Sequence, residues 1–495
     1  MPRSPKPTTA YTWAVAAFGL IFLGYLTARA VLIPVTHDEA NTFMQFVVLP
    51  VMDIVAYTNP VPNNHIFHTL LVKFFTTWFG TSALTVRLPN LLGFVLFYTT
   101  AVLLLRRLSP RPLFTFFGLT LLLCNHYFVD FFSLARGYAL SVSFLMDSVF
   151  AGVVSLQERR NAAFVAAILL SAVAVYTNFT ALNVYVALQL VLFLGLLQES
   201  RFRITQTMLK LFAVAAVINI VLAAVSYWPI TRMVATNQFV YWGTNGFYAD
   251  TVLPLVQSSV HYNGGYFRLP VSAFADLFIA AFFVSFVALF FLRLKPSFLT
   301  NPVGFFYGLM IGTVAVNILQ FHLISTPYLN SRTALSFYFL AALYFIGFAG
   351  LLFRAGAGYA PYWSLPLAAL FVFHFGRAAN LSSCFEWRFD AENYKVLDYV
   401  QQHRQPRDTL VLDTHWLMYP SLAFHTTATK GYEGIRIAPF HIETHPHSPH
   451  PYYYAQREET TLLDPLFSVV QVYGDSSRFL MKRKETNESA APLQR

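Results

Sequence analysis

Long apolar segments recur along most of this 495-residue chain, and nearly all approach the roughly 20 residues that a helix needs to cross a membrane. Eleven are evident, at about 11–33, 89–105, 113–132, 138–156, 162–178, 180–197, 208–228, 272–293, 302–323, 334–353 and 362–378. Only 11% of the residues are charged, against about a quarter in soluble globular proteins. The sequence therefore predicts an all-α polytopic membrane protein and excludes a soluble enzyme or a disulfide scaffold.

Basic residues predict how these segments are oriented, because cytoplasmic loops collect Lys and Arg. One further apolar segment, 66–80, can be counted as a span or as an amphipathic helix lying at the interface, and the polar residues His68 and Lys73 favour the interface. If 66–80 lies at the interface, all the main basic groups fall on the cytoplasmic side. They are Arg106-Arg107-Arg111, Arg159-Arg160, Arg201-Arg203-Lys210, Arg293-Lys295 and Arg354. We therefore expect eleven spans, with the N-terminus inside and the C-terminus outside.

The net charge of +10 comes from the membrane part, because residues 380–495 hold 12 basic against 14 acidic residues. The cytoplasmic connectors account for this excess, so no nucleic-acid partner is predicted. The polar sequence lies mostly outside, in loops 34–88 and 229–271 and in the tail. A protein that places its polar sequence on one face is expected to work at that face. The two cysteines, Cys124 and Cys384, give neither a disulfide framework nor a metal-binding spacing.

An acidic pair, Asp38 and Glu39, follows the first apolar segment directly in the sequence Thr36-His37-Asp38-Glu39-Ala40. A carboxylate at a membrane boundary is costly to desolvate and is commonly functional. The alternative is a hydrated helix cap, since Asp is a good N-cap residue and an amphipathic stretch follows. Position alone leaves both interpretations open.

Several short motifs follow one another along residues 10–355. They are the acidic pair, Asn59-Pro60-Val61-Pro62-Asn63-Asn64-His65, Phe79-Gly80, Arg87-Leu88-Pro89, Phe132-Ser133-Leu134-Ala135-Arg136-Gly137-Tyr138-Ala139-Leu140, Tyr176-Thr177-Asn178-Phe179 and Pro327-Tyr328-Leu329-Asn330-Ser331-Arg332. This ordered set resembles the GT-C class of multi-spanning glycosyltransferases, in the bacterial branch related to protein O-mannosyltransferases and the lipid A aminoarabinose transferase. The chain departs from that pattern at Asn64-His65-Ile66, where His-Pro-Pro is common, and at Asn178, where His is common.

The resemblance implies a GT-C fold and transfer of a sugar from a polyprenyl-phosphate donor to an acceptor hydroxyl at the outer face. Because the phosphate leaves without needing a proton, the site requires only a base for the hydroxyl and cations for the phosphate. Asp38 is the expected base, and attack opposite the departing phosphate would invert the anomeric carbon. Glu39 is expected to orient Asp38 or, with His37, to bind a divalent cation such as Mg²⁺ or Mn²⁺. The alternative for Glu39 is a solvated neighbour.

The remaining candidate residues divide by role. Asp130, the acidic residue of the second outer loop, is either a catalytic partner of Asp38 or half of a salt bridge with Arg136. Arg136 and Arg332 are expected to bind the donor phosphate, because guanidinium groups contact phosphate oxygens bidentately, and His322 could add a third donor. Interfacial anchoring is the alternative for these arginines and the favoured role of Arg87. The substrate-binding candidates are Asn64, His65 and Tyr138.

The third outer loop is rich in aromatic, Asn and Gly residues, in Tyr241–Tyr248 and His261–Tyr266. Such residues can stack on a sugar, but aromatic residues also form the ordinary belt at a membrane interface, which is the favoured interpretation.

The sequence after residue 379 predicts a small extramembrane α/β domain over 380–480, followed by a disordered tail at 481–495. An amphipathic helix is expected at 391–403 and a buried strand at 408–413. The His-rich segment 441–451 can indicate zinc, but its prolines favour a polar surface loop. The membrane part, 1–379, is the predicted catalytic domain.

The sequence therefore predicts a glycosyltransferase of the bacterial cytoplasmic (inner) membrane with a periplasmic active face. Its partners would be a polyprenyl-phosphate-linked sugar donor, a glycan, lipid or protein acceptor, and membrane lipids. The first alternative is a transporter or flippase of lipid-linked sugars, although transporters tend to place ionisable residues near mid-membrane in paired halves. A second alternative is a membrane-anchored binding protein without chemistry.

Overall fold

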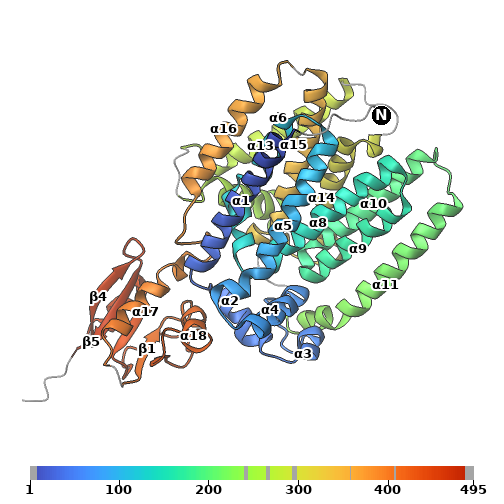
Figure 1. Cartoon of the computed structure of the whole chain (residues 1–495). Coiled ribbons are helices and arrows are strands. Elements are labelled where there is room, and N and C mark those ends of the chain that lie inside the picture. The colour runs from blue at the N-terminus through green and yellow to red at the C-terminus, as the bar shows by residue number, and fades with distance from the viewer. Residues whose placement is uncertain are drawn as a thin grey trace, which may run out of the picture.

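The computed structural model describes residues 8–238, 243–263, 268–291, 298–356, 358–405 and 408–484. Of the third-loop aromatic residues singled out above, Tyr241, Trp242 and Tyr266 lie outside the described residues. The described part consists of a large helical bundle and a small C-terminal domain with a β-sheet (Figure 1).

Eight helical segments are long and apolar enough to cross a membrane. Their helices are α1 (Thr9–Leu32), α5 (Ala83–Leu108), α8 (Gly137–Glu158), α10 (Leu182–Glu199), α11 (Gln206–Ala235), α13 (Val271–Phe291), α14 (Pro302–Ile324) and α15 (Leu335–Ala355). A ninth span arises if α6 (Pro112–Leu123) and the segment His126–Ser133 are counted together, although the two are bent by 75°. The chain is thus a multi-pass membrane protein, as predicted.

By length and composition, the described residues contain eight or nine candidate spans, fewer than the eleven that the sequence predicted. The segment at 113–132 breaks because the Asn125 side chain accepts the Phe128 N–H and starts the short helix α7 (His126–Asp130). The segment at 162–178 forms α9 (Asn161–Thr177), with only 17 residues. The segment at 362–378 forms α16 (Ala360–Ala378), in which Pro366, His374 and Arg377 interrupt the apolar sequence.

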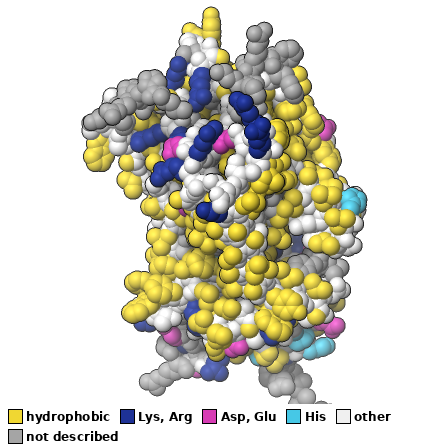
Figure 2. All heavy atoms as spheres, turned by 90° about the vertical axis from the view of Figure 1, so that its right-hand side faces the viewer, with side chains coloured by type: hydrophobic (Ala, Val, Ile, Leu, Met, Phe, Trp, Pro, Cys, Tyr) yellow, Lys and Arg dark blue, Asp and Glu magenta, His cyan; other side chains and the backbone are white. Residues whose placement is uncertain are grey.

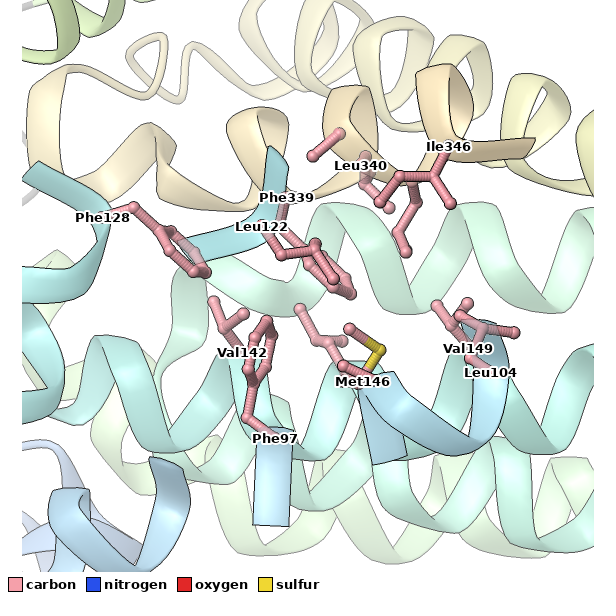
Figure 3. Packing of buried hydrophobic residues seen from close by; sticks show 14 of the residues in the cluster. Phe97, Leu104, Leu122, Phe128, Val142, Met146, Val149, Phe339, Leu340 and Ile346 are labelled. Carbon is pink, nitrogen blue, oxygen red and sulfur yellow. The ribbon is translucent and has the colours of Figure 1, made fainter. Parts of the chain in front are cut away.

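The bundle is held together by large side chains that meet where α5, α6, α8 and α15 face one another (Figure 3). Phe97 of α5, Leu122 of α6, Met146 of α8 and Phe339 of α15 are essentially fully buried there. Between membrane helices such contacts stabilise through close van der Waals packing, and this packing positions the helix ends that carry the outer loops.

The first outer loop contains four short helical segments, α2 (His37–Thr42), the π-helix η1 (Phe43–Val47), α3 (Val51–Ala56) and α4 (Ile66–Phe79). With 14 residues, α4 is about 21 Å long, which is too short to cross a hydrocarbon core of about 30 Å. One face of α4 is buried, including Val72, while Phe74 and Trp78 are exposed. The prediction that 66–80 does not span is confirmed.

The C-terminal domain is a five-stranded mixed sheet in the order β2-β1-β3-β5-β4. Its strands are β1 (Leu410–Thr414), β2 (Ile435–Ile437), β3 (Tyr452–Gln456), β4 (Phe467–Tyr473) and β5 (Arg478–Arg483). β1 runs parallel to β2 and β3, whereas β5 pairs antiparallel with β3 and β4. The domain also contains α17 (Asn393–Gln402), α18 (Tyr419–Thr427) and α19 (Arg457–Leu463). The predicted helix and first strand are confirmed.

The predicted tail begins too early, because β5 continues to Arg483 and pairs with β4 there. Residues 485–495 lie outside the described residues.

The C-terminal domain packs directly on the start of the first outer loop, with α18 against α2 (Figure 1). The Val35 N–H donates to His425 Nε2 over 3.0 Å, and the His37 ring donates from Nδ1 to the Leu417 carbonyl over 2.7 Å. The segment that carries Asp38 and Glu39 is therefore held from both the bundle and the sheet domain.

Lys and Arg side chains gather at one end of the molecule in Figure 2, the end where the N-terminus lies in Figure 1. Arg201 and Arg203, in the connector between α10 and α11, are exposed. One end is thus basic, as the orientation predicts; the side of the membrane that it faces stays a prediction.

Candidate active site

Glu39 is fully enclosed by hydrogen-bond donors. Thr36 caps α2, and its N–H donates to Glu39 Oε2 over 2.8 Å, which closes a capping box. Arg87 of α5 donates from Nε to Oε1 over 2.8 Å and from Nη2 to Oε2 over 2.7 Å, and the Ala135 N–H also donates to Oε1. Both members of the Glu39–Arg87 pair have 0% side-chain exposure.

The Glu39–Arg87 pair joins three segments of the chain. Arg87 also donates to the carbonyls of Ala30, Ile33 and Pro34, at and just beyond the end of α1. Burial raises the pKa of Glu39, but Arg87 and the N–H donors outweigh it, so the net pKa is lowered. Glu39 therefore stays ionised, and the pair fixes the geometry of the loop. Arg87 anchors its helix, as predicted, but it does so through a buried ion pair and not at the membrane interface.

Asp38 lies one residue away in a more open environment. Its Oδ2 is 3.1 Å from Arg332 Nη2 and 3.6 Å from Arg136 Nη2, and its side chain is 12% exposed. Oδ2 has no hydrogen bond of good geometry with any described residue. Burial raises the pKa of Asp38, but Arg136, Arg332 and His37 outweigh it, so the carboxyl pKa is lowered and the group is ionised at neutral pH.

Arg332 is the accessible partner of Asp38. It lies in the 3₁₀ turn η6 (Ser331–Ala334) before α15, and its side chain is 31% exposed. Its guanidinium also approaches Glu386 Oε2 at 3.4 Å and lies 4.9 Å from the Trp387 ring centroid. Glu386 and Trp387 were not predicted from sequence, because they lie just after the last helix of the bundle, in a segment without a recognisable motif.

Arg136 is buried and is held mainly by neutral partners. Its Nη1 donates to Thr42 Oγ1 over 2.9 Å and to the Asp38 carbonyl over 3.3 Å, while its Nε is buried without a hydrogen-bond partner in the described structure. The following residue must be Gly, because a Cβ on Gly137 would lie 2.8 Å from the His65 ring and 2.6 Å from the Thr177 carbonyl. The motif around Arg136 thus brings the charge against the first outer loop.

The substrate-binding candidates line the same region. The His65 and Tyr138 rings meet edge to face at 5.2 Å, and Arg136 lies 6.0 Å from the Tyr138 ring centroid. Burial and the charge of Arg136 lower the pKa of His65, so its ring is neutral. A small hollow beside Arg332 is lined by Tyr138, Ser141, Val142, Leu145, Thr180, Ala181, Arg332, Thr333, Leu335 and Ser336.

Several buried polar atoms of this region have no hydrogen-bond partner among the described residues. They are Asn64 Oδ1, His65 Nε2, both ring nitrogens of His68, Arg136 Nε and Asn178 Nδ2. Buried polar groups are normally satisfied, and each unsatisfied group costs roughly 1–3 kcal/mol. Ordered water or a bound polar ligand would satisfy these atoms. His68 and Asn178 were not among the predicted substrate-binding residues.

Asp130 forms a separate, closed centre. It pairs with Arg29 of α1 and with His126 Nδ1 at 3.2 Å, and Tyr262 donates to its Oδ2. Its side chain is 2% exposed, and that of Arg29 is 0%. The alternative of a salt bridge between Asp130 and Arg136 is wrong, because Arg29 occupies Asp130 and Arg136 faces Asp38. The structure therefore holds Asp38 and Asp130 on different arginines.

The structure pairs none of the remaining candidates with the Asp38 side chain by a hydrogen bond or an ion pair among the described residues. His322 is exposed at the end of α14 and contacts Phe321. The His37 ring donates to the Leu417 carbonyl, and Glu39 is saturated by Arg87 and backbone N–H groups. Among the residues that the structure describes, the one group of His, Cys, Asp or Glu with converging ligand atoms is Asp413, His441 and His445, in the C-terminal domain.

A large apolar cavity of about 580 Å³ lies within the bundle. Phe117, Leu121, Phe278, Phe345, Leu370 and Phe371 are among its lining residues. Phe337 and Tyr338 of α15 also line it, within two helical turns of Arg332. The cavity therefore extends to α15, the helix that follows the turn carrying Arg332.

No family model matches this chain, and no curated protein is similar to it in sequence. Two solved structures of ArnT from Cupriavidus metallidurans match it. The structure bound to undecaprenyl phosphate is 14% identical with a TM-score of 0.45, and the apo structure is 15% identical with a TM-score of 0.48. Each match covers 98% of this chain and 100% of the other. The chain thus has an end-to-end structural match to ArnT at low sequence identity.

Proposed function

We propose that this protein is a glycosyltransferase that moves a monosaccharide from a polyprenyl-phosphate donor to an acceptor hydroxyl at the periplasmic face. The acceptor would be a glycan, a lipid or a protein. The observation that carries the proposal is the Asp38 carboxylate, which lies beside Arg136 and Arg332 and remains partly accessible. Glu39 and Asp130, the other acidic candidates, are each buried in an ion pair with a buried arginine.

Arg332 is the donor's phosphate ligand in this proposal. It is the accessible arginine of the pair, and its planar guanidinium suits bidentate contacts with phosphate oxygens. Sugar departure leaves a polyprenyl phosphate that carries one more negative charge than the phosphodiester donor. A cation at Arg332 therefore stabilises the transition state more than the bound donor, which is the condition for catalysis.

Asp38 is the base. As the acceptor oxygen bonds to the anomeric carbon, the bond to the phosphate oxygen breaks with its electron pair, and the hydroxyl proton passes to Asp38. Attack from the face opposite the phosphate inverts the anomeric centre. A phosphate that takes over Arg332 removes one cation from Asp38, which raises the carboxyl pKa and makes it a stronger base.

The surrounding residues bind the two halves of the donor. Asn64, His65 and Tyr138 face the region where buried polar atoms are unsatisfied, and sugar hydroxyls would supply their partners. The apolar cavity bordering α15 suits a polyprenyl chain, because its lining is almost entirely apolar. Arg136 orders the loop and adds positive charge beside Asp38.

The experiment is mass spectrometry of polyprenyl-phosphate sugars extracted from cells lacking this protein. The cells are complemented with the wild type, with Asp38→Asn, or with Asp53→Asn, a control carboxylate in the same loop. We expect one carrier-linked monosaccharide to accumulate in the null and Asp38→Asn cells, and to be cleared by the wild type and Asp53→Asn. Clearance by Asp38→Asn would reject Asp38 as the base.

A second step separates transfer from transport. The accumulated lipid is mixed with purified protein and membrane acceptors in detergent, where no compartments exist. A transferase releases polyprenyl phosphate from it, and Asp38→Asn does not. A protein that clears the lipid in cells yet leaves the sugar–phosphate bond intact in detergent would be a transporter.

A further inference from the structure

Outside the membrane part, three potential metal ligands converge at one edge of the C-terminal sheet. Asp413 lies near the carboxyl end of β1, and His441 and His445 lie in the loop that follows β2. Because β1 and β2 are parallel neighbours, their carboxyl ends meet at the same edge. The ligand atoms of the three residues all lie within 4.8 Å of one another.

The hydrogen bonds of His441 require a cation at its Nε2. Its Nδ1 is 2.7 Å from the Glu443 carbonyl oxygen, and a carbonyl only accepts, so Nδ1 carries a proton. Its Nε2 is 2.6 Å from Asp413 Oδ1, which already accepts the Thr414 N–H over 2.9 Å. A lone pair at Nε2 would face a carboxylate oxygen. Either a second proton or a metal ion must therefore lie at Nε2.

Two features of His441 are those of a metal ligand, and a second imidazole lies beside it. The His445 ring stacks on the His441 ring with centroids 3.8 Å apart and planes 18° apart, so the exposed His445 side chain must turn to bring one of its nitrogens onto an ion held by His441. The bond from His441 Nδ1 to the Glu443 carbonyl is the outer contact that fixes the tautomer of metal-binding histidines. The side chains of Asp413 and His441 are only 3% and 11% exposed, whereas His445 is exposed, so an ion at this site would be open to water on the His445 side.

We propose that Asp413, His441 and His445 bind one transition-metal ion of the Zn²⁺ class, with water as the fourth ligand. Two imidazoles and one carboxylate suit Zn²⁺, whereas Mg²⁺ and Ca²⁺ prefer all-oxygen ligands. With metal–ligand bonds of about 2.0–2.1 Å in tetrahedral geometry, Nε2 and Oδ1 must lie roughly 3.3 Å apart. The His441–Asp413 contact therefore opens by less than about 1 Å on binding.

The ion would connect the His-rich loop to the strand that leads to the membrane part. Beyond Asp413 the chain continues to Leu417, whose carbonyl accepts from His37, next to Asp38. The segment predicted as a polar surface loop therefore gains a metal-binding role in this proposal, because Asp413 of β1 supplies the third protein ligand. The proposal stands on the C-terminal domain alone, whatever reaction occurs at Asp38.

The test is metal binding by untagged full-length protein in detergent, after chelator treatment and dialysis. Zn²⁺ is titrated against a chromophoric competitor, and Co²⁺ binding is followed by its visible absorption, which is intense for tetrahedral sites. We expect one ion per chain and a loss of affinity of about 100-fold or more in Asp413→Asn, His441→Ala and His445→Ala. His445 is exposed, so His445→Ala tests the site without disturbing the fold.

The matched control is His447→Ala, which removes an exposed histidine two residues further along the same loop. It should bind both ions as the wild type does. The proposal is overturned if the wild type takes up no stoichiometric ion, or if His447→Ala loses as much affinity as His445→Ala, since binding would then be adventitious contact with a His-rich surface.

Discussion

Two acidic residues of the outer loops, Asp38 and Asp130, are both held by arginine but differ in what remains available to a ligand. Asp130 is buried against Arg29, His126 and Tyr262, and both of its oxygens are engaged. Asp38 keeps an oxygen without a well-formed hydrogen bond, beside an arginine whose side chain is 31% exposed. We propose that the degree of enclosure by partners separates the structural carboxylate, Asp130, from the reactive one, Asp38.

The largest expected effect is that of Asp38→Asn on sugar transfer. Asparagine keeps the shape of the side chain but cannot take up the hydroxyl proton, so kcat should fall by about 10²–10⁴-fold. The thermal unfolding temperature should change little, because Arg136 retains its bonds to Thr42 and the Asp38 carbonyl. Turnover and thermal stability are measured on the same purified samples. Full turnover by Asp38→Asn would remove the base from the mechanism.

Asp130→Asn should have the opposite profile. Removing this charge leaves Arg29 buried without its counter-ion, and breaking a buried ion pair costs about 3–5 kcal/mol. We expect a clear fall in the unfolding temperature and near-normal turnover per folded molecule. The double variant Arg29→Met/Asp130→Leu should recover stability, since it removes both charges. Loss of turnover by Asp130→Asn at unchanged stability would instead place Asp130 in the chemistry, as the sequence allowed.

Arg332→Lys tests the phosphate role with a smaller expected effect. Lysine keeps the charge but loses the bidentate geometry, so we expect kcat/KM for the donor to fall by roughly 10–100-fold. Most of this fall should be in kcat, because Arg332 is proposed to bind the transition state more tightly than the donor. Kinetics at varied donor concentration separate kcat from KM. Arg354→Lys, near the other end of α15, is the matched control. Unchanged kcat and KM in Arg332→Lys would leave Arg332 as an ion-pair partner of Asp38 and Glu386 without a role in phosphate binding.

The membrane fold was predictable because its signal is local. Each apolar segment predicts a helix from its own residues. In the same way, the amphipathic pattern at 391–403 predicts α17 and the apolar segment at 408–413 predicts β1. The number of spans was less predictable, because the break between α6 and α7 depends on the Asn125 cap, which hydropathy does not register. The end of the sheet domain was missed because β5 ends in the basic residues Lys482 and Arg483, which resemble a solvated tail.

The candidate site was predictable only in part, because its pairs join distant segments. Asp38, Arg136 and Arg332 were named individually through a family resemblance, and the structure places them together. Nothing in the sequence pairs Arg87 with Glu39 or Arg29 with Asp130, since each pair depends on how helices pack.

The smallest effect concerns pH and follows from the lowered carboxyl pKa of Asp38. A base with a lowered pKa is ionised above that pKa and fails only as the pH falls through it, so kcat/KM should fall only at a pH below that at which an ordinary aspartate titrates. The contribution of this group to stability has the same sign: it is present above the unfolded pKa of about 4 and is lost as the pH falls through the folded pKa. Arg332→Gln removes one of the cations that lower the pKa, so the acid limb should move to higher pH, whereas Asp130→Asn should leave it in place. An acid limb that stays fixed in Arg332→Gln would show that the titrating base is not next to Arg332. Asp38 would then not be the base, and the difference in enclosure between Asp38 and Asp130 would not explain the chemistry.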